Sequence, residues 1–149
     1  MTASYEKQDL KFIYPENWTL TQNDDQDLPW EVSLETPSGA LFSINVFQGG
    51  TDRAELVAGI SSALSEQYED AEITQTTEPF HGHEAIGADA FFYCLDFLVS
   101  ARVRVIETDT YVYVFFYQAE SREFDTNEKV FQAIAVSVLQ NASMSTCKD

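Results

Sequence analysis

Two histidines stand close together at His81-Gly82-His83, and a carboxylate follows directly at Glu84. Imidazole and carboxylate groups are common ligands of transition metals, and residues two apart in a strand point to the same face. The spacing therefore allows a weak metal-binding or enzymatic role at this turn. The ligand set is incomplete, however, because the chain has no other histidine and no third ligand is evident. The pattern favours a polar turn around Gly82 that binds no metal.

The motifs of other common enzyme classes are missing from the sequence. No serine or cysteine stands in a nucleophile elbow, and Gly49-Gly50 lacks the lysine and serine of a phosphate-binding loop. Asp89 and Asp96 stand seven residues apart, on opposite faces of a regular strand, which argues against a joint acid–base site. Salt bridges to Arg102 or Arg104 are the better interpretation. We expect a protein that is not an enzyme and that has no cofactor.

Arginine and aromatic residues alternate with aliphatic ones in a predicted hairpin. Its strands are residues 101–107 and 111–118, and a turn at Thr108-Asp109 places Arg104 opposite Tyr113. One face is aliphatic, as a packed helix requires, and carries Val103, Val105, Val112, Val114 and Phe116. The other, which we call the aromatic face, carries Arg102, Arg104, Tyr111, Tyr113, Phe115 and Tyr117.

The aromatic face has two interpretations. A guanidinium group over an aromatic ring is favourable by about 0.5–1 kcal/mol at exposed sites, and this composition is typical of binding hot spots. The face is therefore a candidate surface for a protein partner. Alternatively, the second predicted helix covers it, and the arginines extend their charged ends to its edge.

The charge of the chain limits its partners. It has 25 acidic residues and 8 basic ones, for a formal net charge of −17. A field of this sign repels the phosphates of nucleic acids and the surface of anionic membranes. We expect neither nucleic acid nor membrane as a partner, which leaves cationic protein segments, divalent ions or simple solubility to explain the charge. Cys94 in an apolar segment and Cys147 in a polar one indicate a buried and an exposed thiol, without a disulfide.

The hydrophobic pattern predicts one domain over residues 1–149, with an ordered core at about 10–140 and a polar tail at 141–149. Helices are expected at about 53–68 and 126–140, because apolar residues recur there at helical spacing. Asp52 with Glu55, and Asp125 with Glu128, resemble capping boxes at their starts. Strands are expected at 10–14, 18–22, 30–35, 41–47, 73–80, 85–99, 101–107 and 111–118.

The longest apolar run, Ala85–Val99, is expected to be one strand that reverses at Ser100. It has apolar residues in both registers, so both of its faces need cover. Two helices, one on each face, would provide it, and short turns make neighbouring strands antiparallel. The prediction is an α+β fold, an antiparallel meander with helices packed on both faces. No segment has the length and hydrophobicity of a signal peptide or membrane span, so we expect a cytoplasmic protein.

The segment Phe12-Ile13-Tyr14-Pro15-Glu16-Asn17-Trp18 resembles the F-x-Y-P-x-x-W pattern that opens PsbP-like and DcrB-like domains. Three further features agree with this resemblance: the central helix at 52–68, Gly82 before a long strand, and the closing helix at 131–139. The resemblance covers about residues 10–140 and implies an α/β/α sandwich around an antiparallel sheet.

The resemblance also implies a mode of action. The superfamily includes extrinsic photosystem proteins, a nuclear-import factor, bacterial lipoproteins and chaperones of secreted effectors, which act mainly by binding. The leading hypothesis is therefore a non-enzymatic protein-binding or adaptor domain with an unidentified protein partner. A small acidic secretion-effector chaperone is the alternative.

Overall fold

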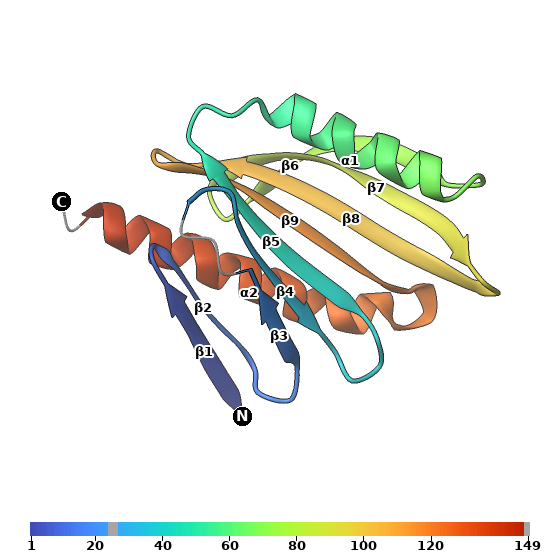
Figure 1. Ribbon diagram of the computed structural model, residues 1–149, viewed down its shortest axis with the longest axis horizontal. Coiled ribbons are helices and arrows are strands. Elements are labelled where there is room, and N and C mark those ends of the chain that lie inside the picture. The colour runs from blue at the N-terminus through green and yellow to red at the C-terminus, as the bar shows by residue number, and fades with distance from the viewer. Residues whose placement is uncertain (24–26, 148–149) are drawn as a thin grey trace.

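The computed structural model describes residues 1–23 and 27–147, except for the side chains of 143–147. Within this part, seven strands form one antiparallel sheet: β3 (Thr19–Gln22), β4 (Trp30–Glu35), β5 (Leu41–Gln48), β6 (Glu72–Phe80), β7 (His83–Cys94), β8 (Phe97–Glu107) and β9 (Tyr111–Glu120). Their order in the sheet is β3-β4-β5-β9-β8-β7-β6 (Figure 1). The sheet thus consists of two meanders, β3 to β5 and β6 to β9, that are joined where β5 pairs with β9.

Both faces of the sheet carry other elements, which gives the predicted α/β/α sandwich (Figure 1). Helix α1 (Arg53–Gln67) packs over β7 and β8 on one face. Helix α2 (Ser121–Cys147) packs over β8 and β9 on the other. The hairpin of β1 (Thr2–Lys7) and β2 (Leu10–Pro15) lies against α2 and extends this second layer.

The two faces have different cores. The face under α2 is aromatic and aliphatic, with Phe42, Phe115 and Phe131 in its centre. The face under α1 is largely aliphatic, and Val103, Val105, Val112 and Val114 are buried there. This side of the predicted hairpin does pack against a helix, as expected.

The turn between β8 and β9 is one residue later than predicted. Thr108 pairs with Tyr111 through its backbone N–H and its hydroxyl, so the turn consists of Asp109 and Thr110. Arg104 therefore lies opposite Phe115 instead of Tyr113. Because the partners move by two residues, every side chain keeps its predicted face.

The predicted long strand at 85–99 is wrong. The chain reverses at Leu95 and Asp96 instead of at Ser100, so 83–94 and 97–107 are two strands paired with each other. Leu95 has a φ of +57°, a left-handed conformation that closes the turn. The apolar run therefore forms the end of a hairpin.

Helix α1 agrees with its predicted range, whereas α2 begins earlier and ends later than predicted. Asp52 caps α1 as expected and accepts hydrogen bonds from the N–H groups of Ala54 and Glu55. Helix α2 starts at Ser121 and continues to Cys147, so Asp125 lies inside it and most of the predicted tail is helical. The strand β1 was not predicted either, because its alternation of exposed and half-buried side chains is weakly hydrophobic. Neither helix has the length and hydrophobicity needed to cross a membrane, as far as the described residues go.

Candidate functional site

The aromatic face of the predicted hairpin is covered by α2. Tyr113, Phe115 and Tyr117 are 1%, 1% and 2% exposed. From α2, the ring of Phe131 lies 5.3 Å from that of Tyr117 and 5.4 Å from that of Phe42, measured between centroids. The proposal of an open binding surface here is therefore corrected: these side chains form the core, because a helix with its own aromatic residue fills the face.

Arg104 is the most buried charged residue of this face, at 2% exposure. Its guanidinium donates to Oδ1 of Asp89 at 2.8 Å, to Oε1 of Glu78 at 3.1 Å and to the carbonyl oxygen of Val103 at 2.9 Å. Burial alone would lower the pKa of Arg104, but the hydrogen bonds to the two carboxylates outweigh it and raise the pKa above its usual value. The guanidinium of Arg104 thus finds its hydrogen-bond partners within the chain, which indicates a structural role for this residue.

Arg102 links the sheet to α2. Its guanidinium pairs with Glu128, lies 3.7 Å from Asp89 and stands 5.0 Å over the ring of Phe124. The predicted salt bridges of Asp89 are thus present. Tyr111 lies at the other end of the face, where its hydroxyl donates to Oδ2 of Asp9 at 2.5 Å. No residue of the predicted set forms an open site with another.

The histidine turn connects β6 and β7. His81 is exposed with a φ of +49°, and Gly82 follows with a φ of +82°. Glu84 is next to His83 in β7, so its side chain points to the opposite side, where it lies 3.5 Å from Arg53. In the described part of the chain, no three His, Cys, Asp or Glu side chains are grouped to hold a metal ion.

Of the large hydrophobic side chains that are exposed in the described part of the chain, all except Met1 and Ile13 lie at the end of the β7–β8 hairpin. We call this set the hairpin patch: Phe91, Tyr93, Leu95, Phe97 and Leu98 are 44%, 55%, 90%, 51% and 37% exposed. Tyr93 lies directly opposite Leu98, so these two and Phe91 share the α2 side of the hairpin. Exposed apolar patches on soluble domains commonly mark interaction sites.

Sequence reasoning missed this patch, since it treated the same residues as a strand buried on both faces. The available signal was Asp96, a charged residue inside an apolar run. Cys94 is exposed at the same place, which corrects the expected buried thiol. The side chain of Cys147 lies outside the described residues.

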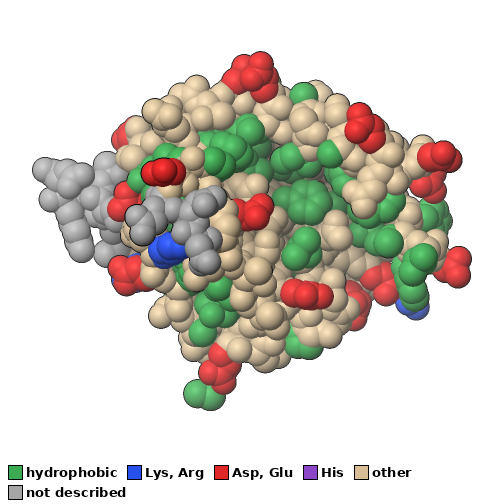
Figure 2. All heavy atoms as spheres, in the orientation of Figure 1, with side chains coloured by type: hydrophobic (Ala, Val, Ile, Leu, Met, Phe, Trp, Pro, Cys, Tyr) green, Lys and Arg blue, Asp and Glu red, His purple; other side chains and the backbone are tan. Residues whose placement is uncertain are grey.

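Carboxylates surround the hairpin patch. Asp96 is in the turn, Glu72 lies directly opposite Phe91 on β6, and Glu120 lies opposite Val99 on β9. Glu69 and Asp70 follow Tyr68, whose ring stacks on that of Phe92 at 4.0 Å. Figure 2 shows the α1 side of this end, where acidic side chains and a basic one lie beside hydrophobic ones. The surface there is apolar with a negative rim.

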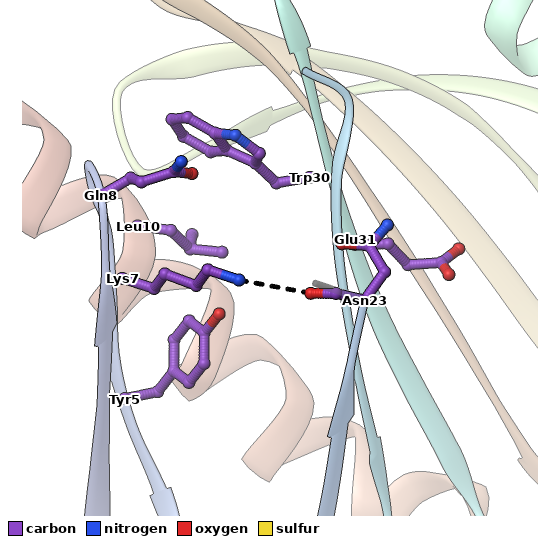
Figure 3. Close-up of a pocket in the computed structure, with 7 residues that line it drawn as sticks. All are labelled: Tyr5, Lys7, Gln8, Leu10, Asn23, Trp30 and Glu31. Carbon is purple, nitrogen blue, oxygen red and sulfur yellow. Dashed lines mark hydrogen bonds between the residues drawn. The ribbon is translucent and has the colours of Figure 1, made fainter. Parts of the chain in front are cut away.

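A small hollow between the β1–β2 hairpin and β4 offers little space (Figure 3). Its volume is about 10 Å³, which is room for about one water molecule. Nζ of Lys7 donates to the carbonyl oxygen of Asn23 at 3.3 Å, and the hydroxyl of Tyr5 donates to Oε1 of Gln22 at 2.7 Å. These two hydrogen bonds connect the β1–β2 hairpin to the sheet beside the hollow.

Comparison with solved structures identifies the architecture. The chain is similar to the cyanobacterial PsbP protein CyanoP from Synechocystis sp. PCC 6803, with 14% identity over 91% of this chain and 90% of that one, at a TM-score of 0.62. The fold is PsbP-like. A Bacteroides thetaiotaomicron protein matches at a TM-score of 0.58 and 8% identity, over 90% of this chain and 46% of that one.

A third match is PA94 from Pseudomonas aeruginosa, described as a protein of unknown function and putative regulator. It has 14% identity over 91% of this chain and 94% of that one, at a TM-score of 0.51. No model of a protein family matches the sequence, and no curated protein matches it. At these identities the PsbP-like likeness concerns the fold alone, so the function has to be argued from the surface.

Proposed function

We propose that this chain is a non-enzymatic protein-binding domain that recognises a segment of another protein through the hairpin patch. The observation that carries the proposal is the concentration of five large apolar side chains, 37% to 90% exposed, at the end of one hairpin. Full burial of an exposed side chain of this kind contributes at most about 1.5–3 kcal/mol, and the contribution is smaller where the side chain is already half buried. A partner that covers several of them gains enough to bind.

The rim of the patch defines the chemistry of the partner. Asp96, Glu72 and Glu120 are joined by Glu69 and Asp70, whereas Arg122 is paired with Glu120. A segment that combines apolar residues with Lys or Arg complements both parts of this surface. An anionic membrane is repelled by the net charge of −17, and a second copy would bring the two acidic rims together.

The test is a selection of random peptides displayed on phage, with the wild-type protein as bait under reducing conditions because Cys94 is exposed. Enriched peptides should combine Leu, Phe or Trp with Lys or Arg. Their affinity should fall at least about tenfold for the double variant Leu95→Ser/Phe97→Ser. Both side chains are largely exposed, so the free energy of unfolding should change little.

Two results would contradict the proposal. One is that no peptide is enriched, or that the enriched peptides bind wild type and double variant equally. The other is a dimer in sedimentation velocity that disappears in the double variant, which would assign the patch to a second copy of the chain.

A further inference from the structure

A groove with a volume of about 260 Å³ lies beside α1, on the face of the sheet opposite α2. Its floor is formed by Val114 and Phe116 of β9. Helix α1 and strand β5 form its two sides, with Ile60, Ala63, Leu64 and Gln67 on the first and Ser43 and Asn45 on the second. Figure 2 looks onto this face and shows hydrophobic side chains gathered below α1, with acidic ones around them.

The groove exists because α1 covers only part of the sheet. The helix packs over β7 and β8, and β5 lies beyond it. Of the fifteen residues of α1, all of them described, only Val57 is buried. Ile60 and Leu64 are apolar but only partly buried, since their outer sides line the groove. An apolar ligand would complete the packing that α1 lacks.

The side chain of Asn45 adds to this apolar surface a hydrogen-bond acceptor that lacks a donor. Its Oδ1 is shielded from water and has no hydrogen-bond partner. A shielded acceptor without a donor is unfavourable, and a half turn of the side-chain amide exchanges its oxygen and nitrogen. Because Asn45 lines the groove, a ligand N–H placed there would supply the donor that this oxygen lacks.

The carboxylate of Glu31 makes the groove more favourable for a cationic ligand than for an anionic one. It lies directly opposite Asn45 in the β4–β5 pair, so both side chains are on the groove side of the sheet. Cβ atoms of residues paired in this way are about 4.5–5.5 Å apart. The exposed carboxylate of Glu31 therefore stands next to the amide of Asn45 and would attract a cation.

We propose that this groove binds a small amine with a flat apolar body. The apolar body would lie on Phe116 and Val114, between α1 and β5. The ammonium group would donate one hydrogen bond to Asn45 and face the carboxylate of Glu31. A volume of about 260 Å³ is just below the range of about 300–1,000 Å³ typical of drug-sized ligands, so one or two rings fit. The groove is separate from the hairpin patch and does not depend on the function proposed for it.

The test uses 1-naphthylmethylamine as the probe and 1-naphthylacetate as its anionic counterpart. Titration into ¹⁵N-labelled protein should give saturable shifts of the side-chain amide of Asn45 and of backbone amides near Phe116. We expect the anion to bind at least about tenfold more weakly, and Glu31→Gln to reduce this preference. Ala63→Phe should fill the groove and abolish binding, while Leu95→Ser/Phe97→Ser should bind as wild type does.

Ala63 is exposed, so the phenylalanine variant is expected to fold, and Ser43→Phe blocks the groove from the opposite side as a second variant. Loss of binding in either folded variant supports the proposal. Saturable binding that persists in both, shifts that map to the hairpin patch, or no saturable binding within the solubility of the amine would overturn it.

Discussion

Among single residues, Arg104 has the buried charged group whose loss should be most destabilising. It is 2% exposed, and the carboxylates of Asp89 and Glu78 are both within 3.1 Å of it. Removing one partner of a buried ion pair leaves the others uncompensated, which costs more than the pair itself contributes. The cluster therefore specifies how β6, β7 and β8 fit together.

Arg104→Met should lower the free energy of unfolding by about 2–3 kcal/mol, measured by urea denaturation, because the hydrogen bonds to two carboxylates are lost while water still reaches Glu78 and Asp89, which are 39% and 32% exposed. Arg122→Met is the matched control, because Arg122 also pairs with a carboxylate but is 79% exposed. An exposed pair contributes at most about 1 kcal/mol. Equal effects of the two substitutions would show that the burial of Arg104 is not what matters.

The covered aromatic face predicts alkaline instability. Burial raises the pKa of Tyr113 and of Tyr117 to about 12, from 10.0 when free. Between these values the unfolded chain releases its tyrosine protons while the folded chain keeps them, so stability is full below pH 10.0 and is lost as the pH rises towards 12. Urea midpoints measured from pH 9 to 12 should fall.

The double variant Tyr113→Phe/Tyr117→Phe removes both groups and should show a shallower fall over the same pH range. Tyr111 remains in both proteins, and its own raised pKa, which follows from burial and from its bond to Asp9, gives a common background. Identical slopes for wild type and variant would contradict the burial of the two hydroxyls.

At the scale of elements, β7 and β8 approach each other too closely for a side chain at Gly87. A Cβ built there would lie 1.8 Å from the carbonyl oxygen of Val103, which is backbone and cannot turn aside. Gly59 in α1 is the opposite case, since nothing lies within 4 Å of the Cβ position.

Gly87→Ala should therefore destabilise the protein by about 2–3 kcal/mol or more, because the strands must separate. Gly59→Ala should stabilise it by about 0.5–1 kcal/mol, because alanine restricts the unfolded chain and favours helix. Both are read from the same urea denaturation curves. A stable Gly87→Ala variant would mean that β7 and β8 are not paired in this register.

The strands also show which parts of the fold can be predicted from the sequence. Alternation of side chains predicts the two faces of β8 and β9 correctly, because a turn that moves by one residue keeps every side chain on its face. The reversal at Leu95 and Asp96 was missed because the apolar run around it satisfies the pattern of a buried strand equally well. Whether Phe91 or Tyr93 is covered depends on where α2 begins. That is determined by tertiary packing and cannot be predicted from a local sequence pattern.

At the scale of the whole molecule, the two helices cover different parts of one sheet. Helix α1 leaves β5 open on one face, while α2 leaves the ends of β7 and β8 open on the other. The groove lies in the first of these uncovered places, and Phe91, Tyr93 and Leu98 of the hairpin patch lie in the second, while Phe97, which pairs with Cys94, is on the α1 side of the same hairpin. The net charge of −17 adds a field over both of them that favours cationic partners.

This field predicts a salt dependence. The affinity of a selected peptide for the hairpin patch should fall about tenfold between 50 and 500 mM NaCl, since screening weakens the attraction of Lys and Arg to the acidic rim. Fluorescence anisotropy of a labelled peptide measures this. A peptide analogue in which Glu replaces each Lys and Arg should bind weakly at all salt concentrations, and equal binding of the two peptides would contradict a role for the rim.

The most direct test of the proposed binding function is to map where such a peptide binds. A selected peptide is titrated into ¹⁵N-labelled protein, and the shifts of the backbone amides are followed by NMR. Binding at the hairpin patch predicts that the largest shifts lie between residues 91 and 98, with smaller ones at the acidic residues beside them. Shifts concentrated on α2, on β3 and β4 or at the histidine turn, with residues 91 to 98 unchanged, would contradict it.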